Sequence, residues 1–148
     1  MNSKERIEDL ILPACIAIRE VFKDELSAGK AIDSHARSKM SAFGASIVMG
    51  SMKATIMNYC NGNAEDGDIN KKLMGCLWQL LKEEECFSPE FRSPKICSEN
   101  GIETLKKIVM EEDNSADKYE EDILTAATAI KMALNLFPLK KQKEGASE

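Results

Sequence analysis

Histidine is nearly absent from this chain, proline is rare, and no hydrophobic run is long. The only histidine is His35, and none of the five cysteines stands in a Cys-x-x-Cys pair, so the usual ligands of a structural zinc site are missing. No apolar run approaches the ~18 residues that a membrane-spanning helix needs, and the N-terminus lacks the apolar centre of a signal peptide. We therefore expect a cytoplasmic protein that has no membrane contact and keeps its thiols reduced.

Helical spacing runs through most of the chain. Apolar residues make up 43% of the sequence and charged residues 30%, as is typical of globular domains. The segments in which apolar residues recur at three- and four-residue steps, the period of an amphipathic helix, are 3–25, 32–59, 69–84, 102–111 and 115–137. We predict one all-α domain over 1–138, a compact bundle of five to six helices around one long central helix. A polar, flexible tail is expected over 139–148.

The segment 32–59 is the one expected to form the central helix. It contains no proline, and an unbroken helix of about 28 residues would be some 40 Å long. Gly44 and Gly50 lie within it, and each weakens a helix by up to ~1 kcal/mol relative to alanine. Their neighbours are also small, namely Ala42, Ala45, Ser46 and Ser51. The glycines therefore indicate either the close approach of another helix or a kink.

No group of polar residues indicates a catalytic site. Asp33, Ser34 and His35 are the residue types of a hydrolase triad, but neighbours on a helix point about 100° apart and cannot form the relay. The chain has no glycine-rich phosphate loop, and its acidic clusters at 83–85 and 111–113 lack the ligand spacing of a metal site. We therefore expect no enzyme activity, no cofactor, no bound metal and no small-molecule substrate.

The charge is distributed unevenly along the chain. The formal net charge is −5, yet residues 31–60 contain one acid and three bases. On an unbroken helix, Lys39 and Lys53 would lie about 40° apart around the axis and ~21 Å along it, so both could touch one phosphate backbone. Arg37 would lie about 160° round from Lys39, on another flank. Ordinary solvated lysines remain the alternative.

One stretch of the long segment is similar to a known family. Residues 41–60 read SAFGASIVMGSMKATIMNYC, and after a loop residues 71–74 read KKLM. This pattern resembles the signature helix of the small helical subunit of type III-B CRISPR effector (Cmr) complexes. That helix has a Phe-Gly/Pro-Ala-x-Ile run, a Gly-Leu-like step and an apolar stretch that ends in an aromatic residue. The chain departs from the family at 49–51, where many relatives have Asn-Gly-Leu and it has Met-Gly-Ser, and in its C-terminal ending.

The resemblance implies a non-catalytic subunit of an RNA-guided complex that acts in antiviral defence. Copies of such a subunit stack along the backbone subunits that carry guide RNA, and they line a channel for target RNA. Lys39 and Lys53, with Arg37 and Lys30, would then contact the nucleic acid. The alternative is a helical adaptor that binds only protein. Salt dependence distinguishes the two, because phosphate contacts weaken steeply as the salt concentration rises.

Overall fold

Nearly all of the regular elements in the part of the chain that the structure describes are helices. The structure is a computed structural model, and it describes residues 3–27, 31–33, 35–60, 67–84, 86–87, 91, 105–107, 119–137 and 139–140. The helices are α1 (Ser3–Val21), α2 (Lys23–Ser27), α3 (His35–Met49), α4 (Met52–Cys60), α5 (Gly67–Glu83) and α7 (Glu120–Leu134). They pack against one another around a single hydrophobic core. The prediction of a compact all-α bundle is confirmed.

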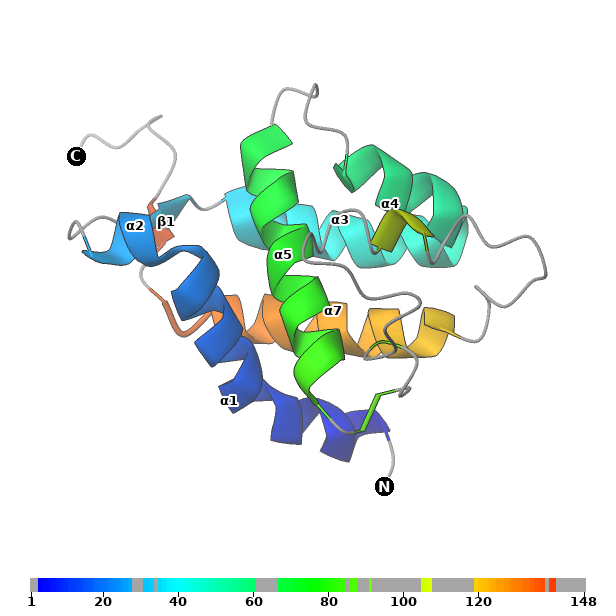
Figure 1. Cartoon of the computed structure of the whole chain (residues 1–148), viewed down its shortest axis with the longest axis horizontal. Helices are drawn as coiled ribbons and strands as arrows, with labels where there is room; N and C mark the ends of the chain where they lie inside the picture. The colour runs from blue at the N-terminus through cyan, green and yellow to red at the C-terminus, as the bar shows by residue number, and fades with distance from the viewer. Residues whose placement is uncertain are drawn as a thin grey trace.

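The helix α7 lies at the centre of the bundle, because α1, α3 and α5 all pack against it. Figure 1 shows α3 and α7 side by side and running in opposite directions, with α5 crossing in front of them and α1 below. Eight of the 15 residues of α7 are buried, and small alanines at 126, 129 and 133 allow its neighbours to approach closely. Its central position gives α7 contact with elements from both halves of the chain.

The first helix begins before its proline. Pro13 lies within the segment 3–25 that was expected to be helical, and α1 runs through it from Ser3 to Val21. Leu10, Ala14 and Ile18 point into the core at the expected spacing. The chain then turns at Phe22 into the short helix α2, which ends at Ser27.

Two short strands pair residues that follow α7 with residues that precede α3. β1 (Ile32–Asp33) pairs in parallel with β2 (Leu139–Lys140), with Ile32 opposite Leu139. The first two residues of the segment expected to be a flexible tail therefore take part in a ladder, and residues 141–148 lie outside the described part of the chain. A two-residue ladder leaves the fold class unchanged.

The prediction of one long central helix over 32–59 is wrong, because the helix ends at Met49 and a new one starts at Met52. The Gly50 N–H donates to the carbonyl oxygen of Ser46 across 2.9 Å, which closes the last turn of α3. The hydroxyl of Ser51 then accepts a 3.1 Å hydrogen bond from the Ala54 N–H and so acts as the N-cap of α4. Gly50 and Ser51 together form a helix stop followed by a helix start.

Burial explains why the chain breaks there. The buried residues of α3 are Ala36, Met40, Phe43 and Ile47. Continued along one straight helix, that stripe would pass through Ser51, Ala54 and Asn58, all of which are exposed in the structure. The buried residues of α4 instead stand one residue further on, at Met52, Thr55 and Tyr59, and Ile56 is buried beside them. Only a change of helix direction places both sets in the same core.

Candidate nucleic-acid interface

The two helices that replace the expected long helix form an antiparallel hairpin, here called the α3–α4 hairpin (35–60). The hydroxyls of Ser46 and Thr55 are hydrogen-bonded at 2.7 Å, close to the turn. Further from the turn, the rings of Phe43 and Tyr59 meet edge to face, with their centroids 5.0 Å apart. The partner of Ser46 is Thr55, and the partner of the earlier Phe43 is the later Tyr59. The two helices are therefore antiparallel, and α4 runs back beside α3 (Figure 1).

Tyr59 fastens the far end of the hairpin. Its hydroxyl donates a 2.8 Å hydrogen bond to the main-chain carbonyl oxygen of Lys39. Burial raises the pKa of Tyr59 above its ordinary value of about 10, because the phenolate would lose hydration. The neutral hydroxyl is therefore available as a donor over the physiological pH range, and it fixes the backbone at a candidate RNA-contacting residue.

The α3–α4 hairpin contains no acidic residue, although the chain as a whole has 25. It carries three bases, Arg37, Lys39 and Lys53. Screening limits the reach of a surface charge to about 8–10 Å at physiological ionic strength. The surface of the hairpin can therefore attract a polyanion even though the whole chain is acidic.

The structure places three of the four predicted site residues. Arg37 is exposed near the start of α3, Lys39 is half-buried, and Lys53 is exposed in the first turn of α4. Lys30 lies outside the described residues. Two of the predicted contacts therefore lie on open surface, on different helices of the hairpin.

The predicted geometry of the two lysines is wrong. The values of about 40° and ~21 Å assumed that Lys39 and Lys53 share one continuous helix. They lie instead on antiparallel helices, with Lys53 beside the turn and Lys39 in the first half of α3. The bases do not line one helix face. They are distributed over the two-helix surface, because the chain folds back at Gly50.

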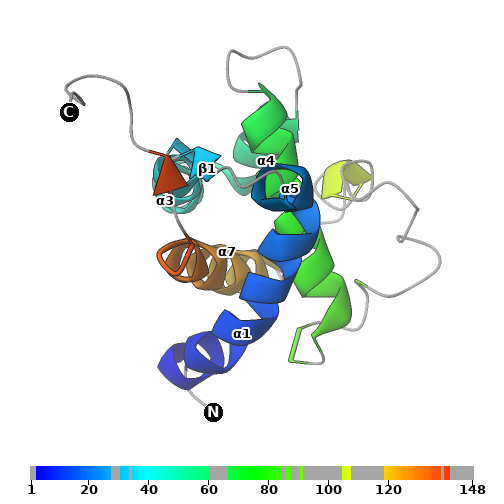
Figure 2. The same cartoon turned by 90° about the vertical axis from the view of Figure 1, so that its left-hand side faces the viewer.

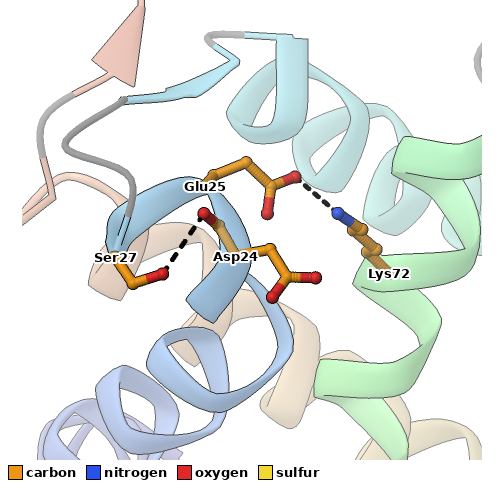
Figure 3. Close-up of polar contacts among 4 residues, drawn as sticks. All are labelled: Asp24, Glu25, Ser27 and Lys72. Carbon is orange, nitrogen blue, oxygen red and sulfur yellow. Dashed lines mark hydrogen bonds and ion pairs between the residues drawn. The ribbon is translucent and has the colours of Figure 1, made fainter.

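Lys72, in the KKLM stretch, has a structural partner. Its ammonium forms an ion pair with Glu25 of α2, with 2.5 Å between Nζ and Oε2 (Figure 3), and lies 5.5 Å from the centre of the Phe22 ring. Figure 3 also shows the Ser27 hydroxyl donating to the main-chain oxygen of Asp24, at the end of the same short helix. Lys72 thus joins α5 to α2, whereas its neighbour Lys71 is exposed.

The described residues offer little other chemistry. Among them, no three histidine, cysteine or acidic side chains come together as metal ligands, and no helix is both long and apolar enough to cross a bilayer. Cys76 is fully buried, and its burial raises the pKa of the thiol well above the ordinary value. A buried protonated thiol behaves as a small hydrophobic group.

The sequence did not reveal Asn135 as a neighbour of the candidate site. Its side-chain oxygen Oδ1 accepts a hydrogen bond from Nη1 of Arg37 at 2.5 Å, across 98 residues of sequence. The available signal was weak: the acid-free end of the segment 115–137 could have been matched with the acid-free segment 35–60. Nothing in either segment specifies their antiparallel pairing.

Comparison with protein-family models, curated proteins and solved structures gave no match to this chain. The residues themselves are therefore the evidence for a function. Those residues are the acid-free hairpin, its exposed bases Arg37 and Lys53, and the side chain of Asn135 that reaches the first of them.

Proposed function

We propose that this protein is a non-catalytic subunit of an RNA-guided effector complex of the type III-B CRISPR kind. In this role it packs beside the backbone subunits and copies of itself, and it helps to hold target RNA. One observation carries the proposal: the α3–α4 hairpin presents three bases and no acid. Phosphate contacts need cations that neighbouring carboxylates do not neutralise, and the exposed Arg37 and Lys53 of this hairpin are the candidates.

The residues that carry the resemblance support a structural role for the motif. Phe43 and Ile47 are buried in the core, and Tyr59 closes the hairpin. These residues hold α3 and α4 together and so fix the positions of the bases on the two helices. A phosphate-binding surface of this kind depends on positioning by a rigid scaffold and not on chemistry, which is consistent with a subunit that holds RNA without cleaving it.

A second candidate function, a helical adaptor that binds only protein, is favoured by the end of α3. Val48 and Met49 are 68% and 86% exposed there, beside the turn of the hairpin. Large apolar side chains at such exposure are suited to contact with another protein. A subunit of an RNA-guided complex and a protein-binding adaptor both need contact with another protein. The two functions differ in whether the chain also binds RNA.

Purification of a tagged copy from the native host tests the proposal. We expect guide RNA and the backbone subunits to be recovered with the wild-type chain. An Arg37→Gln/Lys53→Gln variant should recover the same proteins but retain much less target RNA, because it removes two exposed positive charges. Recovery of proteins without any RNA would establish the adaptor function instead. Equal retention of target RNA by the double variant would show that these two residues are not the contacts.

A further inference from the structure

A side-chain contact joins the start of the hairpin to the C-terminal end of α7. Arg37 near the start of α3 donates from Nη1 to Oδ1 of Asn135, the residue that follows α7, and both side chains are exposed. Lys131 lies four residues before Asn135, so the two side chains are neighbours on one face of the helix. The antiparallel packing of α3 and α7 (Figure 1) thus places a fourth base one helical turn from the residue that Arg37 contacts.

This end of α7 has the same charge pattern as the hairpin. The acidic residues of α7 all stand in its first turn, at 120–122, which lies at the other end of the helix. From 123 to 135 the chain has no acid, and Lys131 is the one base. Among the described residues, the structure pairs neither Arg37 nor Lys131 with a carboxylate. Both cations therefore keep their charge available to a phosphate.

The neutrality of Asn135 is what makes its contact with Arg37 useful. A guanidinium has five N–H donors in a planar fork, and a single hydrogen bond to an amide oxygen leaves the others available for a phosphate. The amide restricts the orientation of Arg37 without cancelling its charge. An aspartate at the same position would accept the same hydrogen bond but would also neutralise the arginine.

We propose that Lys131 contacts the RNA backbone directly and that Asn135 is a positioning residue that orients Arg37 toward it. This inference rests on the proposed function, because it names further residues of the same RNA-holding surface. The surface is then built from two segments far apart in the chain, α3 and the C-terminal end of α7.

The first experiment measures binding of the full chain to a fluorescein-labelled single-stranded oligouridylate by fluorescence anisotropy over a series of salt concentrations. Lys131→Gln should weaken binding several-fold and lower the slope of log affinity against log salt by roughly 1, as expected when one phosphate contact is lost. Lys131→Arg should restore both values, because it keeps the charge. Lys107→Gln is the matched control, since residues 105–107 lie on the opposite side of α5 from α3 and α7 (Figure 2).

The second experiment is a double-mutant cycle at Arg37 and Asn135. Asn135→Ala should weaken binding less than Arg37→Gln does, and the two changes together should be no worse than Arg37→Gln alone, because the amide acts only through that guanidinium. A purely structural role for Asn135 predicts a lower melting temperature with an unchanged salt slope. Strictly additive losses of affinity would also overturn the positioning role.

The outcomes separate the inference from the function on which it rests. If Arg37→Gln and Lys53→Gln weaken binding while Lys131→Gln behaves like Lys107→Gln, the hairpin holds RNA and the extension onto α7 is wrong. If the wild-type chain shows no salt-dependent binding even at low salt, direct RNA contact fails and the extension fails with it.

Discussion

The hydroxyl of Tyr59 at the end of α4 donates a 2.8 Å hydrogen bond to the main-chain carbonyl oxygen of Lys39 in α3. The bond joins the two arms of the hairpin at the end away from the turn, while the Ser46–Thr55 pair joins them close to it. A backbone acceptor cannot be lost by substitution of Lys39. The bond therefore persists in charge variants of that residue, and the surface can be altered without opening the hairpin.

Tyr59→Phe should lower the free energy of unfolding by about 1 kcal/mol, the usual net worth of one hydrogen bond. The ring would still meet Phe43, so packing is preserved and only the hydroxyl is lost. Urea denaturation followed by circular dichroism measures the change. Tyr59→Leu serves as the comparison, and it should be more destabilising because it also removes the aromatic contact. Equal stability of wild type and Tyr59→Phe would show that the bond contributes nothing.

Alkaline pH should destabilise the protein in part through Tyr59. Burial raises the pKa of its hydroxyl in the folded chain, so the unfolded chain ionises first. The unfolded state then binds fewer protons than the folded state, and the free energy of unfolding falls as the pH rises above about 10, the pKa of an unfolded tyrosine. Denaturation curves at pH 8 to 11 check this. The fall should be shallower in Tyr59→Phe, and identical profiles would contradict it.

Ser51→Ala should destabilise the fold by about 1 kcal/mol, because it removes the side chain that caps α4. Ser51→Asp should retain most of the stability, since a carboxylate accepts the same hydrogen bond from the Ala54 N–H. Thermal melting measures both variants. Ser41→Ala, at an exposed position inside α3, is the control and should be neutral or slightly stabilising. A similar effect of the two alanine substitutions would argue against the cap.

The cysteines should differ strongly in reactivity. Cys86 is exposed, whereas Cys76 is fully buried and burial raises its pKa, which removes the reactive thiolate at pH 8. Iodoacetamide labelling of the native protein followed by peptide mapping should find Cys86 modified and Cys76 intact. Both should react in urea. Modification of Cys76 at a comparable rate without denaturant would mean that the core opens readily.

Much of the core could be predicted from the spacing of apolar residues. Leu10, Ala14 and Ile18 in α1, and Leu73, Leu77 and Leu80 in α5, are buried as their helical spacing indicates. The period of an amphipathic helix depends only on local geometry, so a sequence displays it directly. The presence of these helices and their inward faces follows from the chain itself.

The break at Gly50 was less evident, although the sequence carried a sign of it. The one-residue shift of the apolar stripe, from Ile47 to Met52 and Ile56, is incompatible with one straight buried face. Glycine and serine at 50–51 then supply the stop and the cap. We had considered a kink as one interpretation of the glycines, but a full reversal depends on what α4 packs against, and that is a tertiary contact.

By itself, the sequence determined the all-helical class, the inward faces of the helices and the acid-free stretch over 35–60, because these depend on residue order along the chain. Only the tertiary structure decided that the bases stand on a hairpin and that Asn135 reaches Arg37. Such a contact joins residues 98 positions apart, and its formation depends on the packing of α3 on α7 through a shared core. No local spacing rule encodes that arrangement.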